Sequence, residues 1–253
     1  MLRTALPLPV LLLLAACATT ASNPDLQTRE ATNDLALANL NLGIEYMRRG
    51  EYERALEKLD KARAADPSYA LTYNTYGVLY QRLGETARAE QNFRKALQLR
   101  PGESSTLNNY GRFLCQQGRQ DEAQKAFASA AANPLYETPE IPIANAAACS
   151  MASGQTREAE QSFRRALDIN PKLPIALLQM ARLSYDQEKF LPARGYLQRY
   201  IAVAPHTAES LWLGIRIEQQ LGDRNTVSSF ALLLRNRFPD SNEARQLRES
   251  GIK

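Results

Sequence analysis

The residue types that carry most enzyme chemistry are sparse in this sequence. His206 is the only histidine, and it directly follows Pro205. A single histidine at such a junction is typical of a solvated residue rather than a catalytic one. The sequence contains no His-x-x-His, Cys-x-x-Cys, Gly-x-x-x-x-Gly-Lys or Gly-x-Ser-x-Gly motif. Metal, phosphate-loop and nucleophile-elbow chemistry therefore lack their usual residues.

The carboxylates also favour structure over catalysis. Glu53 and Glu57 alternate with basic residues such as Lys58 and Lys61. This spacing is typical of charge pairs on a helix surface, worth a few tenths of a kcal/mol each. We therefore interpret the protein as a binding scaffold rather than an enzyme, and we expect no metal, no cofactor and no small-molecule substrate.

Cys17 ends an apolar run that begins at Ala5 and follows the basic residue Arg3. The run has about a dozen residues, whereas a membrane-spanning helix needs roughly 20. A basic start, a short apolar stretch and small residues at its end indicate a secretory signal cut just before Cys17. The tetrad Leu14-Ala15-Ala16-Cys17 resembles the bacterial lipobox, which implies that residues 1–16 are a lipoprotein signal peptide and that Cys17 carries acyl chains. The alternative is a plain secretory signal with a chance cysteine.

The residues after Cys17 indicate the cellular compartment of the protein. In Gram-negative lipoproteins an aspartate at the next position usually indicates retention at the inner membrane, whereas here the residue is Ala18. The resemblance therefore implies a lipid anchor on the periplasmic face of the outer membrane. Residues 17–34 are polar and are predicted to be the lipidated N-terminus and a flexible tether. The formal charge of +4 becomes +3 once Arg3 is removed, which does not favour nucleic-acid binding.

The rest of the sequence repeats with a period of 34 residues. The second copy carries Tyr76-Gly77, Tyr80, Ala89, Phe93, Ala96 and Pro101, and the same residue classes recur in the first and third copies. The pattern resembles the tetratricopeptide repeat, in which small residues let two helices approach and a proline ends the second one. The resemblance implies an all-α, right-handed superhelical solenoid.

Six repeats and a cap account for residues 35–253. The repeats are predicted near 36–69, 70–103, 104–137, 140–173, 174–207 and 208–241, with a capping helix in 242–253. A two-residue insertion falls before the fourth repeat, where Pro139 and Pro142 are expected to interrupt any helix. The fourth repeat has Ala146-Ala147 in place of Tyr-Gly, and the first half of the sixth repeat matches loosely.

Cys115 and Cys149 fall on the first helices of the third and fourth repeats, which are neighbours in such a stack. An oxidising compartment and this topology favour a disulfide that would clamp the two repeats across the irregular junction. The alternative is two separate core thiols.

The family resemblance also implies a binding face, because positions 2, 5, 9, 12 and 13 of each first helix line the concave side. The predicted partner-binding groove consists of Leu37, Leu40, Ile44, Met47, Leu71, Asn74, Val78, Asn108 and Arg112. Its apolar start suits an amphipathic helix or an apolar segment, with the later polar residues holding an extended partner. Alternatively, residues 18–34 cover the first repeat. Arg182, Tyr185, Trp212 and Arg216 could form a second contact region.

A lipobox followed by six such repeats resembles the PilF/PilW lipoprotein family of type IV pilus biogenesis. The resemblance rests on residues 14–17, on the repeat series and on the pair Cys115 and Cys149. It implies a pilotin, a lipoprotein that brings secretin subunits to the outer membrane and assists their oligomerisation. Two other hypotheses remain: an adaptor for murein hydrolases or outer-membrane-protein assembly factors, and a glycan-processing enzyme.

Overall fold

The computed structural model describes residues 24–252, and their side chains from residue 34 onward. The described residues form helices and no strand. The helices are α1 (Pro24–Arg48), α2 (Tyr52–Ala65), α3 (Ala70–Arg82), α4 (Thr86–Leu99), α5 (Ser104–Gln116), α6 (Gln120–Ala131), α7 (Glu140–Ala152), α8 (Thr156–Ile169), α9 (Pro174–Asp186), α10 (Phe190–Ile201), α11 (Ala208–Leu221), α12 (Arg224–Arg237) and α13 (Asn242–Glu249).

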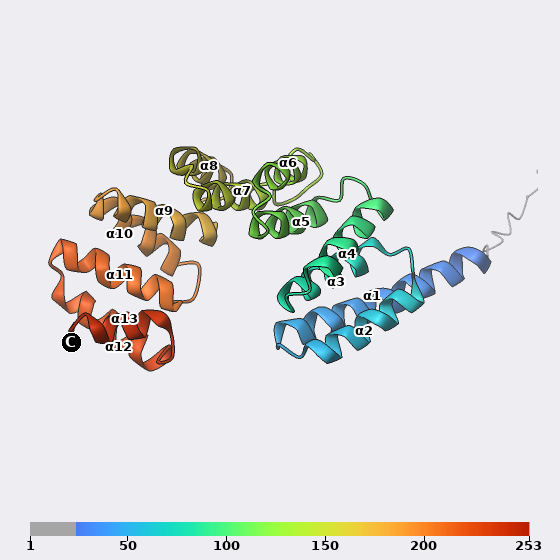
Figure 1. Cartoon of the computed structure of the whole chain (residues 1–253), viewed down its shortest axis with the longest axis horizontal. Helices are drawn as coiled ribbons and strands as arrows, with labels where there is room; N and C mark the ends of the chain where they lie inside the picture. Colours follow the sequence, from blue (N-terminus) through green and yellow to red (C-terminus); the bar gives the residue numbers. More distant parts are fainter. Residues whose placement is uncertain (1–23, 253) are drawn as a thin grey trace, which may run out of the picture.

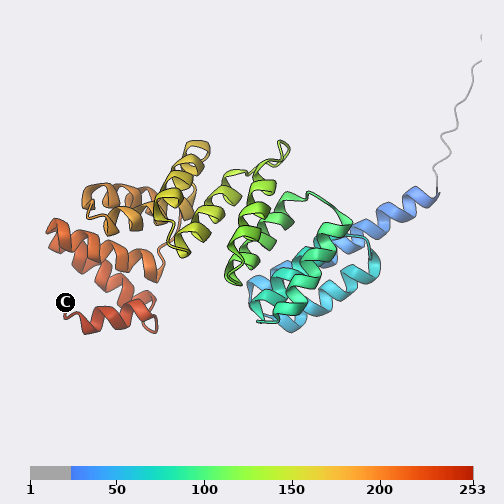
Figure 2. The same ribbon diagram turned by 45° about the horizontal axis from the view of Figure 1, so that its top comes forward.

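The helices pair into six repeats, each with a first and a second helix, and α13 packs on the last pair. This is the predicted all-α solenoid with a C-terminal capping helix. First helices of successive repeats contact one another, whereas the described second helices do not contact the second helix of the next repeat. The stack therefore curves with the first helices inside, and it follows an open arch from α1 to α13 (Figures 1 and 2).

Two predicted boundaries need correction. Residues 24–34, predicted as part of the tether, continue α1 upstream of the first repeat. Pro24 suits a first helical position, since its missing N–H would have no partner there. Pro142, expected to interrupt any helix, lies in the first turn of α7. A proline is tolerated at that place because the first amides of a helix have no intrahelical acceptor.

Within a repeat, a small residue on the first helix faces a large one on the second. This pair determines how closely the two helices pack. A Cβ atom added to Gly77 would lie 2.7 Å from the ring of Phe93, and one on Gly111 would lie 2.8 Å from Phe127. The sixth repeat keeps this pair one residue earlier than a strict period would place it, since a Cβ atom added to Gly214 would lie 2.7 Å from the ring of Phe230. This shift explains why the sequence pattern is loose there.

The turn between the two helices of a repeat needs a residue in the left-handed backbone conformation, with positive φ. Gly50, Gly84, Gly118 and Gly154 all have φ between 74° and 83°. The fifth repeat places Glu188 at this point, with φ of 58°. A side chain is disfavoured in this conformation, so the fifth repeat carries a local strain that the glycine-containing repeats avoid.

No helix within residues 24–252 combines the length and apolarity that crossing a membrane would require.

Candidate partner-binding surface

The first helices bring the predicted groove residues to the inner side of the arch, but two of them are core residues. Leu40 is 2% exposed and Met47 is 5% exposed. Both belong to the cluster that joins the first two repeats, together with Leu59, Tyr76 and Leu79. Predicting them as groove contacts was wrong, because the helical position of a residue gives its direction and not the depth to which the next repeat covers it.

The aliphatic side chains that remain accessible form a shorter surface. Leu37 is 42% exposed, and Ile44, Leu71 and Val78 are half-buried. Each of these three half-buried side chains packs on one side against the core cluster of the first two repeats. We call Leu37, Ile44, Leu71 and Val78 the inner apolar strip. It crosses α1 and α3, and its chemistry suits an aliphatic or amphipathic segment.

Asparagine side chains connect successive first helices along the same face. The Asn109 side-chain amide donates to Oδ1 of Asn74 at 3.2 Å, and that of Asn145 donates to Oδ1 of Asn108 at 2.8 Å. Asn74 and Asn108 are both buried at 7% exposure, so predicting them as groove contacts was also wrong. Sequence reasoning selected these two and missed their donors, although the consecutive asparagines 108 and 109 were a visible signal. These two hydrogen bonds, which we call the asparagine ladder, fix the spacing of α3, α5 and α7.

Arg112 is exposed on α5, and the predicted second region lies farther along the inner side. Arg182, Trp212 and Arg216 line one hollow of about 290 Å³ between α9, α11 and α13. The Arg216 guanidinium lies 4.3 Å from the ring centroid of Tyr185. The structure therefore brings together the four residues that the sequence suggested for this region, on a surface separate from the inner apolar strip.

Cys115 on α5 and Cys149 on α7 face each other between the third and fourth repeats. Their sulfur atoms are 2.09 Å apart and their Cα atoms 5.9 Å apart, within the geometric range of a disulfide. Cys149 is buried, whereas Cys115 is half-buried toward the inner side. Cys17 lies outside the described residues.

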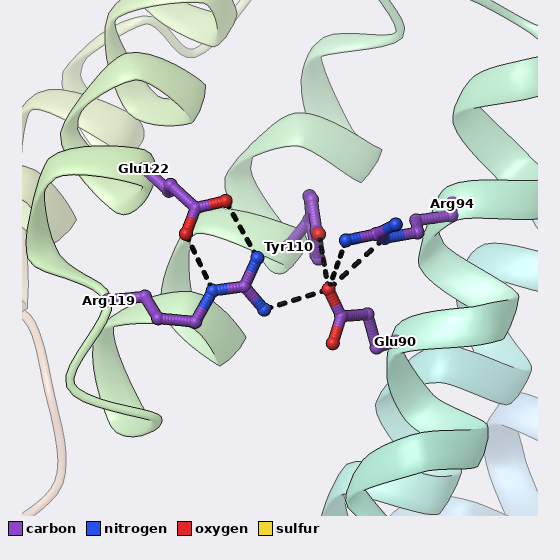
Figure 3. Close-up of polar contacts among 5 residues, drawn as sticks. All are labelled: Glu90, Arg94, Tyr110, Arg119 and Glu122. Atoms are coloured by element: carbon purple, nitrogen blue, oxygen red, sulfur yellow. Dashed lines mark hydrogen bonds and ion pairs between the residues drawn. The ribbon is translucent and has the colours of Figure 1, made fainter.

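A polar network on another side of the stack joins the second and third repeats (Figure 3). Oε1 of Glu90 accepts hydrogen bonds from Arg119 at 2.8 Å, Arg94 at 2.8 Å and Tyr110 at 3.0 Å. Arg119 also donates to both carboxylate oxygens of Glu122. These bonds, that from Arg119 foremost, hold the pKa of Glu90 below its ordinary value. The ionised network fixes α4 against α5 and α6, and so supports the curvature of the inner side.

His206 is half-buried and packs edge-on against Phe230, with ring centroids 5.8 Å apart. Burial and the nearby charge of Arg237 lower the pKa of His206. The side chain is therefore a packing element rather than the solvated residue that the sequence suggested. Across residues 24–252, no group of three or more histidine, cysteine, aspartate or glutamate residues is placed to hold a metal ion.

Residues 24–34 do not cover the first repeat. They extend α1 as one uninterrupted helix, which projects beyond α2 (Figure 1). A segment in line with the helix that carries Leu37 and Ile44 cannot also fold back over their inner side. For these residues, the alternative in which the tether fills the groove is excluded.

Comparison with known proteins identifies tetratricopeptide repeats in this chain and a relative that matches nearly all of it. Tetratricopeptide repeat family models match residues 34–102, 92–125 and 150–213. The type IV pilus assembly protein PilF of Pseudomonas aeruginosa is 31% identical over 230 residues, which cover 91% of each chain.

Two solved structures extend this similarity to the fold. The structure of Pseudomonas aeruginosa PilF has a TM-score of 0.72 and 31% identity, covering 87% of this chain and 99% of that one. The structure of PilW, described as a widely conserved type IV pilus biogenesis factor, has a TM-score of 0.71 and 31% identity, covering 85% of this chain and 99% of that one.

Proposed function

The chain belongs to the PilF/PilW family of type IV pilus biogenesis proteins, and from this premise we propose that it acts as a pilotin. In this proposal it binds the type IV pilus secretin, brings it to the outer membrane and promotes its oligomerisation. The protein is a repeat scaffold and not an enzyme, as its family indicates. The work it does on its partner is therefore binding and positioning.

Delivery to the membrane would come from Cys17. Removal of residues 1–16 and acylation of Cys17 would anchor the mature chain, since two or three acyl chains hold a protein far more firmly than one. Ala18 favours sorting to the outer membrane. The helix α1 begins at Pro24, so residues 18–23 and the projecting first part of α1 would separate the acylated cysteine from the first repeat. A partner bound near α1 would then be held close to the bilayer.

Partner binding would use the inner apolar strip, and this is the structural observation that carries the proposal. Leu37 and Ile44 on α1 present aliphatic side chains beside Leu71 and Val78 on α3. An apolar or amphipathic segment of the secretin would remove them from water at about 25 cal/mol per Å² of apolar area. Arg112, exposed on α5 along the same side, could hydrogen-bond the backbone carbonyls of the bound segment.

A disulfide between Cys115 and Cys149 would stabilise the packing of the repeats that follow this surface along the stack. It would link α5 to α7, closing a loop with a sequence separation of 34 residues. In the chain-entropy account, a loop of this size stabilises the folded state by roughly 3 to 4 kcal/mol. The closed loop contains the junction between α6 and α7, where the repeat spacing is irregular.

The direct test is Cys17→Ser in a strain that carries the pilus system. We expect the secretin to lose its outer-membrane location and its multimers to decrease, while the soluble variant keeps its helical content. Thr19→Ser is the control, because it changes a residue beside the anchor without removing the acylated cysteine. Normal secretin rings at the outer membrane in the Cys17→Ser strain would reject delivery by the lipid anchor.

A further inference from the structure

The outer side of the first two repeats carries a hollow that the proposed function does not use. It lies between α2 and α4, with residues of α3 in its lining, and has a volume of about 600 Å³. The two second helices do not contact each other, so a furrow opens between them. We call this hollow the outer groove and define it by Arg63, Tyr80, Arg88, Arg94 and Lys95.

One face of α4 supplies most of the outer groove. Gln91 and Asn92 each lie three or four residues from both Arg88 and Lys95, and all four line the hollow. Such spacing places side chains on one side of a helix. From Arg88 to Gln98 the face extends about 15 Å, at 1.5 Å per residue. Its length suits a short peptide segment rather than a single small ion.

The charges that line the outer groove are all positive. Four basic side chains and no carboxylate contribute to the lining. The carboxylates that pair with these cations stand outside the hollow: Asp60 with Arg63 at 2.7 Å, Glu85 with Arg88 at 2.9 Å and Glu90 with Arg94 at 2.8 Å. Among the described residues, Lys95 takes part in none of these ion pairs. The interior of the groove is therefore complementary to an anionic ligand.

Two of the arginines are held in place by aromatic rings. The guanidinium of Arg63 lies 5.4 Å from the ring centroid of Tyr76, and that of Arg88 lies 5.3 Å from that of Tyr80. A ring at this distance attracts the guanidinium and limits the positions that it samples. A carboxylate entering the groove would meet donors that need little further ordering, which favours binding.

We propose that the outer groove binds an acidic segment of a protein partner. A peptide narrow enough to enter the hollow meets the cations, whereas a flat anionic bilayer would also meet the exposed carboxylates of Asp60 and Glu85. Gln91 and Asn92 supply donors and acceptors for the backbone of the segment. The groove lies on the outer helices and the inner apolar strip on the first helices, so one chain can hold two segments at once.

The test uses the mature chain with Cys17→Ser, which removes the acyl chains. The probe is a fluorescein-labelled twelve-residue peptide of glutamate and alanine, with its glutamine counterpart as the neutral control. We expect saturable, salt-sensitive binding of the glutamate peptide by fluorescence anisotropy. Arg88→Glu with Lys95→Glu should weaken it about tenfold or more, because two attractive charges become repulsive.

The matched control is Lys125→Glu with Arg157→Glu, which makes the same change of charge at exposed positions of α6 and α8. An equal loss of affinity in both double variants would overturn the proposal, as would absence of binding by the parent chain. Circular dichroism checks the fold, and Arg88→Gln with Lys95→Gln replaces the test variant if it unfolds.

Two further measurements distinguish this proposal from membrane binding and from peptide binding on the inner side. Binding to phosphatidylglycerol vesicles without binding to the glutamate peptide would assign the outer groove to the membrane and overturn the peptide proposal. Ile44→Glu alters the inner apolar strip and should leave the affinity for the glutamate peptide unchanged. Loss of peptide binding in Ile44→Glu would show that the probe binds on the inner side, which contradicts the proposal without bearing on delivery of the secretin.

Discussion

Nη1 of Arg119 lies 2.8 Å from Oε1 of Glu90, and this ion pair ties the second repeat to the third. Arg119 precedes α6 and Glu90 lies on α4, so the pair spans two second helices whose main chains are not in contact. Both side chains are largely sheltered, at 29% and 24% exposure. A network of several partners in such a place contributes more than an isolated surface pair.

Glu90→Gln should lower the free energy of unfolding by about 1 to 2 kcal/mol at neutral pH, since it removes a charge that accepts hydrogen bonds from three residues. The pKa of Glu90 is lowered in the folded state. Its contribution is therefore complete above the unfolded value of about 4.3 and is lost as the pH falls through the lower folded pKa.

Urea denaturation at pH 7 and pH 3 checks this prediction. The difference between the parent and Glu90→Gln should be large at pH 7 and small at pH 3. Glu57→Gln is the control, because Glu57 pairs with Lys61 on an exposed helix surface and should change stability less. An equal difference at both pH values would mean that the charge of Glu90 is not responsible.

Leu37→Glu with Ile44→Glu should abolish secretin binding. It should lower stability only in part, because Leu37 is exposed and Ile44 is half-buried against the core. Leu135→Glu with Leu191→Glu is the matched control, since these leucines are exposed elsewhere at 88% and 67%. Co-purification of secretin measures binding. Unchanged recovery with the first pair would contradict the role of the inner apolar strip.

Leu40→Ala should act differently from those substitutions and destabilise the first repeat by about 2 to 5 kcal/mol through an internal cavity. The physical reason is that Leu40 lies in the cluster between the first two repeats. Thermal denaturation followed by circular dichroism measures the loss. Retention of full stability would mean that the side chain is not packed as described.

The mature Cys17→Ser chain, unfolded without reductant, should expose no free thiol if Cys115 and Cys149 are bonded. Reaction with a thiol reagent counts the groups, and prior reduction of the same sample should give two. Two thiols per chain before reduction would restore the alternative of two separate core cysteines.

Glu188→Gly should stabilise the fifth repeat by roughly 0.5 to 1 kcal/mol, since glycine adopts positive φ without a side-chain penalty. A small increase in the melting temperature is the expected readout. Gly154→Glu, the reverse change at the corresponding turn of the fourth repeat, should lower it. A destabilised Glu188→Gly variant would show that the glutamate side chain has a compensating contact.

The repeat period determined the number of helices and their pairing, because Gly77 with Phe93 and its counterparts recur wherever two helices must approach. The same period failed in the sixth repeat, where the equivalent pair, Gly214 and Phe230, stands one residue early. A pattern tied to fixed positions cannot recognise a pair of residues that shifts together.

The tertiary structure alone decided which concave positions are accessible. Sequence position placed Leu37, Leu40, Ile44 and Met47 on one side of α1, but packing of the second repeat buries Leu40 and Met47 and leaves the inner apolar strip. The asparagine ladder and the Glu90 network were also set by contacts between repeats. The periodic pattern specifies local helix geometry and its faces, whereas burial and hydrogen-bond partners depend on distances between residues far apart in the chain.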